Sequence, residues 1–223
     1  MITSRLQSII NYAHGRVIAD IGTDHAFIPI ELISVGRAEK VIASDIRRGP
    51  LDSAVRNINA AGMSDKIETR LGSGLSVLNS GEADMIIVAG MGGEMIEKII
   101  KEDEGTARAS ELILQPMNSQ YELRKFLLGS GFAIKDEDIA VEGFKVYNIM
   151  LVESGRQEEF ESDIYYHVPP YLKAHKNFDK LYEKKLREFN KVISGLERSG
   201  ECDEKKLERY RQWKEELIDI YSR

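Results

Sequence analysis

Short apolar runs separated by helical patterns fill the first 150 residues. We expect strands at residues 16–22, 40–46, 67–72, 83–89 and 111–115. Between these runs apolar residues recur at the spacing of amphipathic helices. We expect helices at residues 25–35, 49–62, 94–101 and 121–129, with Pro29 in the first turn of its helix. This alternation predicts an α/β fold with a mostly parallel sheet that has helices on both faces.

Two further runs, residues 132–141 and 145–152, lie close together in sequence and predict an antiparallel pair at the sheet edge. The pattern changes at Pro169–Pro170, beyond which no strand-like run occurs. An apolar stripe with intervals of 4, 3, 4 and 3 then predicts a coiled-coil seam of Tyr182, Leu186, Phe189, Ile193 and Leu196. A second stripe follows Ser199–Gly200. The chain is therefore predicted to comprise a sheet domain (1–168) and a helical hairpin (169–223).

Composition excludes several classes of protein. A single cysteine among 223 residues excludes a disulfide framework and a cysteine-type zinc site, and no histidine spacing indicates a metal site. No apolar run approaches the ~18 residues of a membrane span, and residues 1–16 lack the apolar core of a secretory signal. We therefore expect a cytoplasmic protein with no membrane segment and no metal.

The net charge of −6 is unevenly distributed along the chain. Residues 171–223 carry 14 basic and 11 acidic residues, whereas residues 1–170 carry 17 basic and 26 acidic residues. Such asymmetry is a hint of an appendage that faces a polyanion. A simple solvated surface explains it equally well.

The loop after the first strand, residues 20–26 (DIGTDHA), lies where a Rossmann-type fold binds its cofactor. A dinucleotide fingerprint needs three glycines, and this loop has only Gly22. Asp20 and Asp24 flank the loop, and a carboxylate ~4 Å from a phosphate costs about 4 kcal/mol at an effective dielectric of ~20. The acids instead favour S-adenosylmethionine, which is cationic and has no phosphate. Asp45, 25 residues after Asp20, is placed to accept hydrogen bonds from ribose hydroxyls.

Two glycine-containing turns follow later strands. In residues 72–74 (GSG), Ser73 could bond the adenine of the cofactor, although a simple turn is nearly as plausible. In residues 89–93 (AGMGG), three glycines permit close approach to backbone N–H groups. The acid-or-Asn, Pro, Pro, aromatic pattern of amino-group methyltransferases is absent here. The loop therefore favours an acceptor that needs no strong base, such as a ring nitrogen.

These motifs together resemble the bacterial tRNA (adenine-N1)-methyltransferases of the TrmK family. The matching segments are DIGTDHA (20–26), SDI (44–46) with GPL (49–51), GSGL (72–75), AGMGG (89–93) and LQPM (114–117). The resemblance covers the whole chain. It implies a class I Rossmann-like methyltransferase sheet with a C-terminal hairpin, and transfer of a methyl group from S-adenosylmethionine to N1 of adenine 22 in the D-arm region of tRNA.

The resemblance also implies where the site residues lie. The cofactor would be bound by Asp20, Gly22, Thr23, Asp24, Asp45, Ile46, Gly72, Ser73, Ala89 and Gly90. Gly90, Met91 and Gly92 would lie between donor and target base, and His25 could position either one; no general base is implied. RNA phosphates would be bound by Arg47, Arg48, Lys180, Lys184, Lys185 and Arg187. We expect a monomer or weak dimer.

Three alternatives stay open at this point. The acceptor could be a small molecule or a protein, with the hairpin serving dimerisation. The chain could instead be a non-catalytic nucleotide-binding scaffold whose coiled coil recruits a partner. A nicotinamide oxidoreductase is the weakest alternative, because the first loop disfavours a diphosphate.

Overall fold

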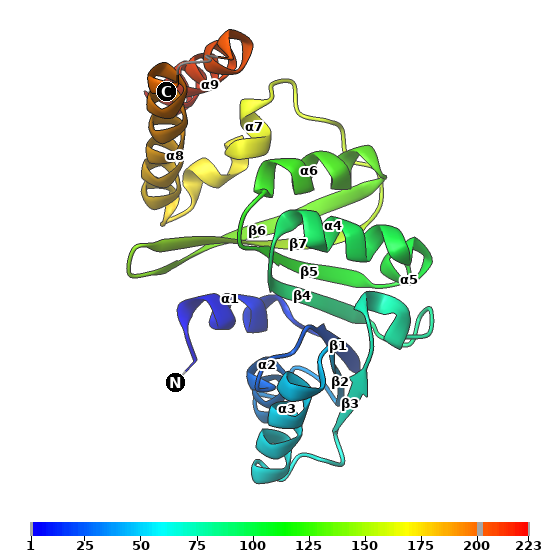
Figure 1. Cartoon of the computed structure of the whole chain (residues 1–223). Helices are drawn as coiled ribbons and strands as arrows, with labels where there is room; N and C mark the ends of the chain where they lie inside the picture. The colour runs from blue at the N-terminus through cyan, green and yellow to red at the C-terminus, as the bar shows by residue number, and fades with distance from the viewer. Residues whose placement is uncertain (1, 200–202, 223) are drawn as a thin grey trace.

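A seven-stranded sheet forms the centre of the computed structural model, which describes residues 2–199 and 203–222 (Figure 1). The strand order is β3-β2-β1-β4-β5-β7-β6. The strands are β1 (Val17–Ile21), β2 (Lys40–Asp45), β3 (Ile67–Leu71), β4 (Met85–Met91), β5 (Glu111–Pro116), β6 (Phe132–Glu142) and β7 (Lys145–Ser154). Strands β1 to β5 pair in parallel, and β7 pairs antiparallel with both β5 and β6. The predicted mostly parallel sheet with an antiparallel edge pair is therefore confirmed.

Helices cover both faces of the sheet because its central strands are apolar on both sides. Successive β4 residues alternate: Met85 and Ile87 pack in one hydrophobic cluster, Ile86 and Val88 in the other. The first cluster lies under α1 (Ser4–Tyr12), α2 (Phe27–Ser34) and α3 (Arg48–Ala60). The second lies under η1 (Gly74–Val77), α4 (Gly93–Glu102), α5 (Glu104–Arg108) and α6 (Gln120–Gly129).

The N-terminal helix α1 is absent from the sequence-based prediction. Its apolar residues Leu6, Ile9 and Ile10 have helical spacing, and the Thr3 hydroxyl accepts a hydrogen bond from the Leu6 N–H at its start. Ile9 and Ile10 are buried against the sheet. Packing therefore stabilises a helix that is only nine residues long, too short to be stable alone.

The C-terminal segment forms a third hydrophobic cluster at the β6 edge. The C-terminal segment comprises α7 (Ile164–His167), η2 (Pro170–Ala174), α8 (Phe178–Arg198) and α9 (Glu204–Ser222). The expected boundary at 168/169 falls inside this cluster, since Val168 and Leu172 both belong to it, together with Ile139 and Val146 of the sheet. Helix α8 thus packs directly on β6 and β7, and α9 packs on α8 and α7.

The buried stripe of α8 differs from the expected seam. The buried residues of α8 are Phe178, Leu181, Lys185, Phe189 and Ile193. Tyr182 and Leu186 are only partly buried, and Tyr182 stacks on Tyr221 of α9 at 4.2 Å between ring centroids. The stripe shifts because α8 packs against the sheet edge as well as against α9. Gly200 of the predicted turn lies outside the described residues.

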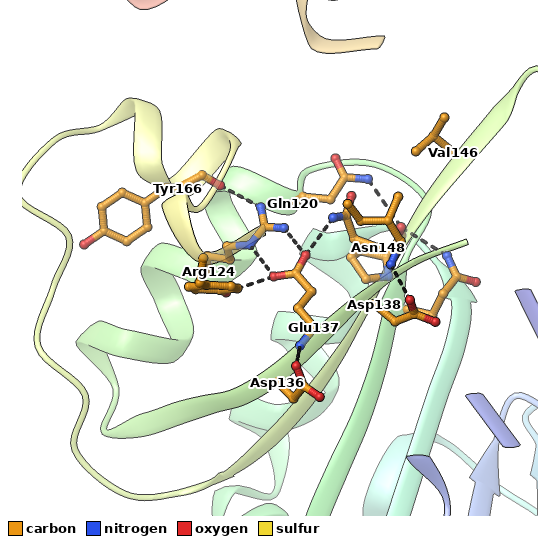
Figure 2. A network of polar contacts seen from close by, with 12 residues as sticks. Gln120, Arg124, Asp136, Glu137, Asp138, Val146, Asn148 and Tyr166 are labelled. Carbon is orange, nitrogen blue, oxygen red and sulfur yellow. Dashed lines mark hydrogen bonds and ion pairs between the residues drawn. The ribbon is translucent and has the colours of Figure 1, made fainter. Parts of the chain in front are cut away.

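A buried polar network joins this segment to the sheet (Figure 2). Glu137 of β6 pairs with Arg124 of α6, and both side chains are fully buried. Glu137 also accepts hydrogen bonds from Asn148 Nδ2 at 2.6 Å and from the Tyr171 hydroxyl at 3.0 Å. Arg124 donates to the Tyr166 carbonyl at 2.7 Å. One buried ion pair thus ties α6, α7 and η2 to the sheet.

Candidate active site

A cavity of ≈ 700 Å³ opens at the carboxyl ends of the parallel strands. It lies beside β1 and β4, which are neighbours in the centre of the sheet. The chain leaves β1 toward α2 on one face and leaves β4 toward α4 on the other face. Ligands of open α/β sheets bind at such a switch point.

Most of the residues expected at the cofactor site line this cavity. They are Asp20, Gly22, Asp24, Asp45, Ile46, Gly72, Ser73, Ala89 and Gly90, joined by Met91 and Arg47 from the other expected sets. Thr23 is buried and does not line the cavity. Neither do His25, Gly92 or Arg48. The ends of four strands therefore bring together residues up to 71 positions apart in sequence, from Asp20 to Met91.

Asp20 is the acid with the most perturbed ionisation in the cavity. It is 4% exposed at the end of β1. Burial raises the pKa of Asp20 to about 6; the neighbouring Thr23 side chain opposes this rise, and the nearby charge of Asp45 adds to it. The ionised carboxylate is therefore destabilised in the free protein. A cation bound beside it would relieve that cost.

Asp45 is held in place by the start of the next loop. Its Oδ1 accepts a hydrogen bond from the Arg47 backbone N–H at 2.7 Å, and the Arg47 guanidinium lies 3.7 Å away. The Asp45 side chain is 7% exposed, whereas that of Arg47 is 75% exposed. Asp45 is thus a fixed acceptor in the wall, and Arg47 is a cation at the rim.

The β1 and β4 loops touch at Gly22 and Met91. Gly22 has a φ of +80°, and a Cβ built on it would lie 2.1 Å from Met91 Cε. Gly93, which starts α4, is packed against the loop after β5, because its Cβ would lie 2.5 Å from the Ser119 carbonyl oxygen. Glycine is favoured at Gly22 by its positive φ, and it is required at Gly93 by the close approach of the backbone after β5.

Arg5 escaped the sequence-based site assignment, and its partner Gln115 was expected beside the active site, at the end of the fifth strand, without a role. The fully buried Gln115 accepts hydrogen bonds at Oε1 from the Gly90 N–H at 3.1 Å and from Arg5 Nη1 at 2.7 Å. Arg5 lines the cavity and lies over the Tyr147 ring. We call residues 90–92, the last two residues of β4 and the residue after them, the Gly90 loop; α1 and β5 thereby fix its position. A glutamine after an apolar strand was a visible signal, but its contact with Arg5 spans 110 residues.

His25 lies outside the cavity lining in a strained turn. His25 and Ala26 have φ values of 61° and 56°, and Asn57 donates to the His25 carbonyl at 2.9 Å. The His25 imidazole lies 3.4 Å from Asp24, and α2 begins without a side-chain cap. The imidazole therefore contacts an exposed carboxylate of the same loop.

Two of the six expected RNA-binding residues are engaged with the protein instead. Lys185 is 5% exposed and pairs with Glu188 at 2.8 Å. Lys184 donates to the Val146 carbonyl at 2.9 Å, and burial lowers the pKa of its ammonium. In this structure both ammonium groups therefore have partners within the protein, which charge along a helix does not reveal, because it does not show which side packs on the sheet. Arg47, Arg48, Lys180 and Arg187 are exposed.

The fold and the acid-lined cavity at the switch point define a Rossmann-like methyltransferase. The donor set suits S-adenosylmethionine, since Asp20 is a buried acid that lines the cavity and Asp45 is a fixed acceptor for hydroxyls. The described residues bring no three His, Cys, Asp or Glu side chains into a metal-binding group. Within the same residues no helix has the length and apolarity to cross a bilayer.

Comparison with known proteins defines the family. Residues 2–150 match the family model for a methyltransferase domain. The tRNA (adenine(22)-N(1))-methyltransferase of Bacillus subtilis (strain 168) is 32% identical over 213 residues, which are 92% of this chain and 90% of that protein. The crystal structure of the B. subtilis m1A22 tRNA methyltransferase TrmK has a TM-score of 0.87 at 30% identity, covering 99% of both chains.

A second solved structure contains a ligand. Streptococcus pneumoniae Sp1610 in complex with S-adenosyl-L-methionine has a TM-score of 0.86 at 31% identity, covering 99% of this chain and 100% of that one. This chain belongs to the tRNA (adenine(22)-N1)-methyltransferase family, TrmK, and the family resemblance of its motifs is confirmed.

Proposed function

We propose that this protein transfers a methyl group from S-adenosylmethionine to N1 of adenine 22 in tRNA, at the cavity between β1 and β4. One observation supports this proposal above all: Asp20, Asp45 and Gly90 line the same cavity at the switch point. The membership of the chain in a tRNA methyltransferase family supports the same substrate. A tRNA substrate also favours the cytoplasm as the site of action.

Different residues of the cavity would bind the cationic end and the adenosine end of the cofactor. Asp20 would face the cationic end of the cofactor, and Asp45 would accept hydrogen bonds from its ribose. Ser73 and Gly72 would border the adenine, with Ile46 packing against it. Gly90, held by Gln115, would present an unhindered backbone to the target base.

The reaction requires no side-chain base. When bound, S-adenosylmethionine supplies an electrophilic methyl group that bonds to the N1 lone pair as the carbon–sulfur bond breaks, leaving S-adenosylhomocysteine and a cationic 1-methyladenine. N1 of adenine carries no proton, so no residue has to accept one. The task left to the Gly90–Gly92 loop is alignment and exclusion of water. The carboxylate of Asp24, which is exposed at the cavity, would stabilise the positive charge of the product.

The RNA would contact basic side chains at the rim and on the hairpin. We assign this role to Arg47 and Arg48 beside the cavity, and to Lys180 and Arg187 on α8. Lys180 and Arg187 lie 3.4 Å and 3.8 Å from Glu183, which leaves both exposed and only loosely paired. Charge removal at phosphate contacts should weaken binding and reduce its salt dependence.

Methylation of an unmodified tRNA transcript tests the proposal. The purified protein and labelled S-adenosylmethionine should label the transcript and block reverse transcription at adenine 22. A transcript with guanine at position 22 is the matched control and should stay unlabelled. Label at another position, or in protein or a small molecule, would refute the N1 assignment. Cofactor binding without transfer to any acceptor would favour a scaffold. Sedimentation of the same sample tests the expected monomer or weak dimer.

A further inference from the structure

The most exposed large apolar side chain in the described part of the chain lies at the tip of the β6–β7 hairpin. Phe144 is 102% exposed, so nothing in the described structure covers its ring. Gly143 before it has a φ of +58°, which makes the turn tight. The next two residues along β7, Val146 and Tyr147, are 6% and 7% exposed. The exposed ring therefore stands at the end of a well-packed hairpin.

This tip projects from the cavity edge of the sheet. Strand β6 runs in the same direction as β1 to β5, because both β5 and β6 pair antiparallel with β7. Its end at Glu142 therefore points the same way as the strand ends around the cavity. The last β5 pairing is Leu114 with Met150, so residues 145–149 continue beyond it by about 17 Å at ~3.4 Å per residue. Figure 1 shows the hairpin reaching outward between α1 and the start of α8.

The residues on both sides of Phe144 are fixed to neighbouring helices. Glu142 Oε1 accepts a hydrogen bond from the Arg5 backbone N–H at 2.7 Å, and Arg5 itself lines the cavity. On the other side, the Val146 carbonyl accepts from Lys184 of α8 at 2.9 Å. The tip is thus held by the cavity wall on one side and the helical hairpin on the other.

The surface around the tip carries exposed cations. Lys145 lies next to Phe144, and Lys173, Lys176 and Lys180, in and between η2 and α8 beside the β6–β7 hairpin, are exposed. Lys184 and Lys185 are not part of this surface, because they bond the Val146 carbonyl and Glu188. Without these two, residues 173–187 carry four Lys or Arg and two acids, a net charge of +2 with His175 counted as neutral. The acids of this region are Glu142, which accepts from the Arg5 N–H, Asp138, which bonds His175, Glu183, which lies beside Lys180, and the exposed Asp179.

We propose that Phe144 stacks on an unpaired nucleobase of the tRNA, beside the methylation site. An uncovered aromatic ring among lysines is the chemistry that binds flexible nucleic acid, because any base offers a face for stacking and the phosphates meet the cations. A membrane or an acidic protein would satisfy the charge but would not account for the position of the tip at the cavity edge. The inference rests on the proposed function and adds a contact between the protein and an unpaired nucleotide.

Steady-state kinetics of Phe144→Ala test this inference. We expect KM for tRNA to rise about tenfold, which corresponds to about 1.4 kcal/mol. The kcat at saturating tRNA and the Kd for S-adenosylmethionine should not change. Phe144→Trp should restore KM to within about threefold of the unmodified protein. Val35→Ala is the matched control, since Val35 is 51% exposed at the end of α2, which leads away from the cavity edge, and its KM should not move.

A direct readout is the fluorescence of Phe144→Trp. After subtraction of the Trp213 signal of the unmodified protein, tRNA should quench the added indole, whereas S-adenosylmethionine alone should not. Unchanged KM for Phe144→Ala, or no quenching, overturns the inference while methylation of adenine 22 by the unmodified protein still supports the proposed function. A dimer that Phe144→Ala converts to monomer would also overturn it, because the tip would then bind a second copy of this chain.

Discussion

Binding of S-adenosylmethionine should depend on pH through Asp20. In the free protein burial raises the pKa of this carboxyl from 3.8 to about 6, which corresponds to about 3 kcal/mol against the ionised form at neutral pH. A bound cation stabilises the carboxylate. The cofactor should therefore bind the ionised form in preference to the protonated form, and binding below pH 6 should release a proton.

The magnitude follows from the ionised fraction. With a pKa of about 6, Asp20 is about one-tenth ionised at pH 5 and about nine-tenths ionised at pH 7. The Kd for S-adenosylmethionine should therefore be about tenfold lower at pH 7 than at pH 5. The amino group of the cofactor stays protonated through most of this range, since an α-amino group has a pKa of about 7.7–8.0.

Calorimetric titration from pH 5 to pH 7 in buffers of different ionisation enthalpy measures both the Kd and the proton release. Asp20→Asn should bind the cofactor weakly and with a flat pH profile. Asp24→Asn is the matched control, because Asp24 is an exposed acid of the same cavity and its variant should keep the slope. A flat profile for the unmodified protein, or an equal slope in Asp20→Asn, would refute the reasoning.

The raised pKa of Asp20 also makes the stability of the folded protein depend on pH. Because the pKa of Asp20 is raised in the folded state, its protonated form stabilises the folded protein. This contribution to the free energy of unfolding is fully present below pH 3.8 and is lost as pH rises through about 6. Asp20→Asn should therefore raise the free energy of unfolding of the cofactor-free protein at pH 7, by up to about 3 kcal/mol. Urea denaturation of both proteins at pH 4 and pH 7 measures the difference, which should be small at the lower pH.

Three further substitutions test the packing of the site and of the hairpin. Gly22→Ala should weaken S-adenosylmethionine binding at least tenfold by calorimetry, because its Cβ would displace the end of the Met91 side chain, which lines the cavity. Gly62→Ala, with a φ of +68° and open space, should keep full affinity, and equal affinities would contradict the contact. Glu137→Ala should lower the free energy of unfolding by about 3–5 kcal/mol in urea denaturation, because Arg124 stays buried without its partner. Glu97→Ala, which breaks an exposed pair, should cost about 0–1 kcal/mol, and equal losses would count against the buried network. Gln115→Leu should lower kcat about tenfold with little change in the Kd for the cofactor, since it releases the Gly90 loop; an unchanged kcat would show that the loop needs no such support.

The positions of the strands along the chain could be predicted because each strand carries a local signal. Residues 83–89 form an uninterrupted apolar run after Asp84, and such a run is buried on both faces in the structure. The loops after β1 and β4 were placed correctly for the same reason, since a strand end fixes where its loop lies. Most of the predicted cavity residues therefore came together at the strand ends, although Thr23 and Gly92 in the same two loops do not line the cavity.

The rest of the site depends on contacts that no local pattern contains. Arg5 reaches the cavity only because α1 packs under the sheet, and its partner Gln115 lies 110 residues away. The burial of Lys185 follows from the orientation of α8 on the sheet edge. A charge pattern along a helix cannot show which of its faces is covered by a distant strand.

Titration of the free protein with S-adenosylmethionine and, separately, with NAD shows whether the acids around Gly22 select a cation and reject a diphosphate. We expect one molecule of S-adenosylmethionine bound per chain, with its affinity lost in Asp45→Asn, and no heat of binding for NAD. Tight binding of NAD that S-adenosylmethionine displaces would contradict this expectation.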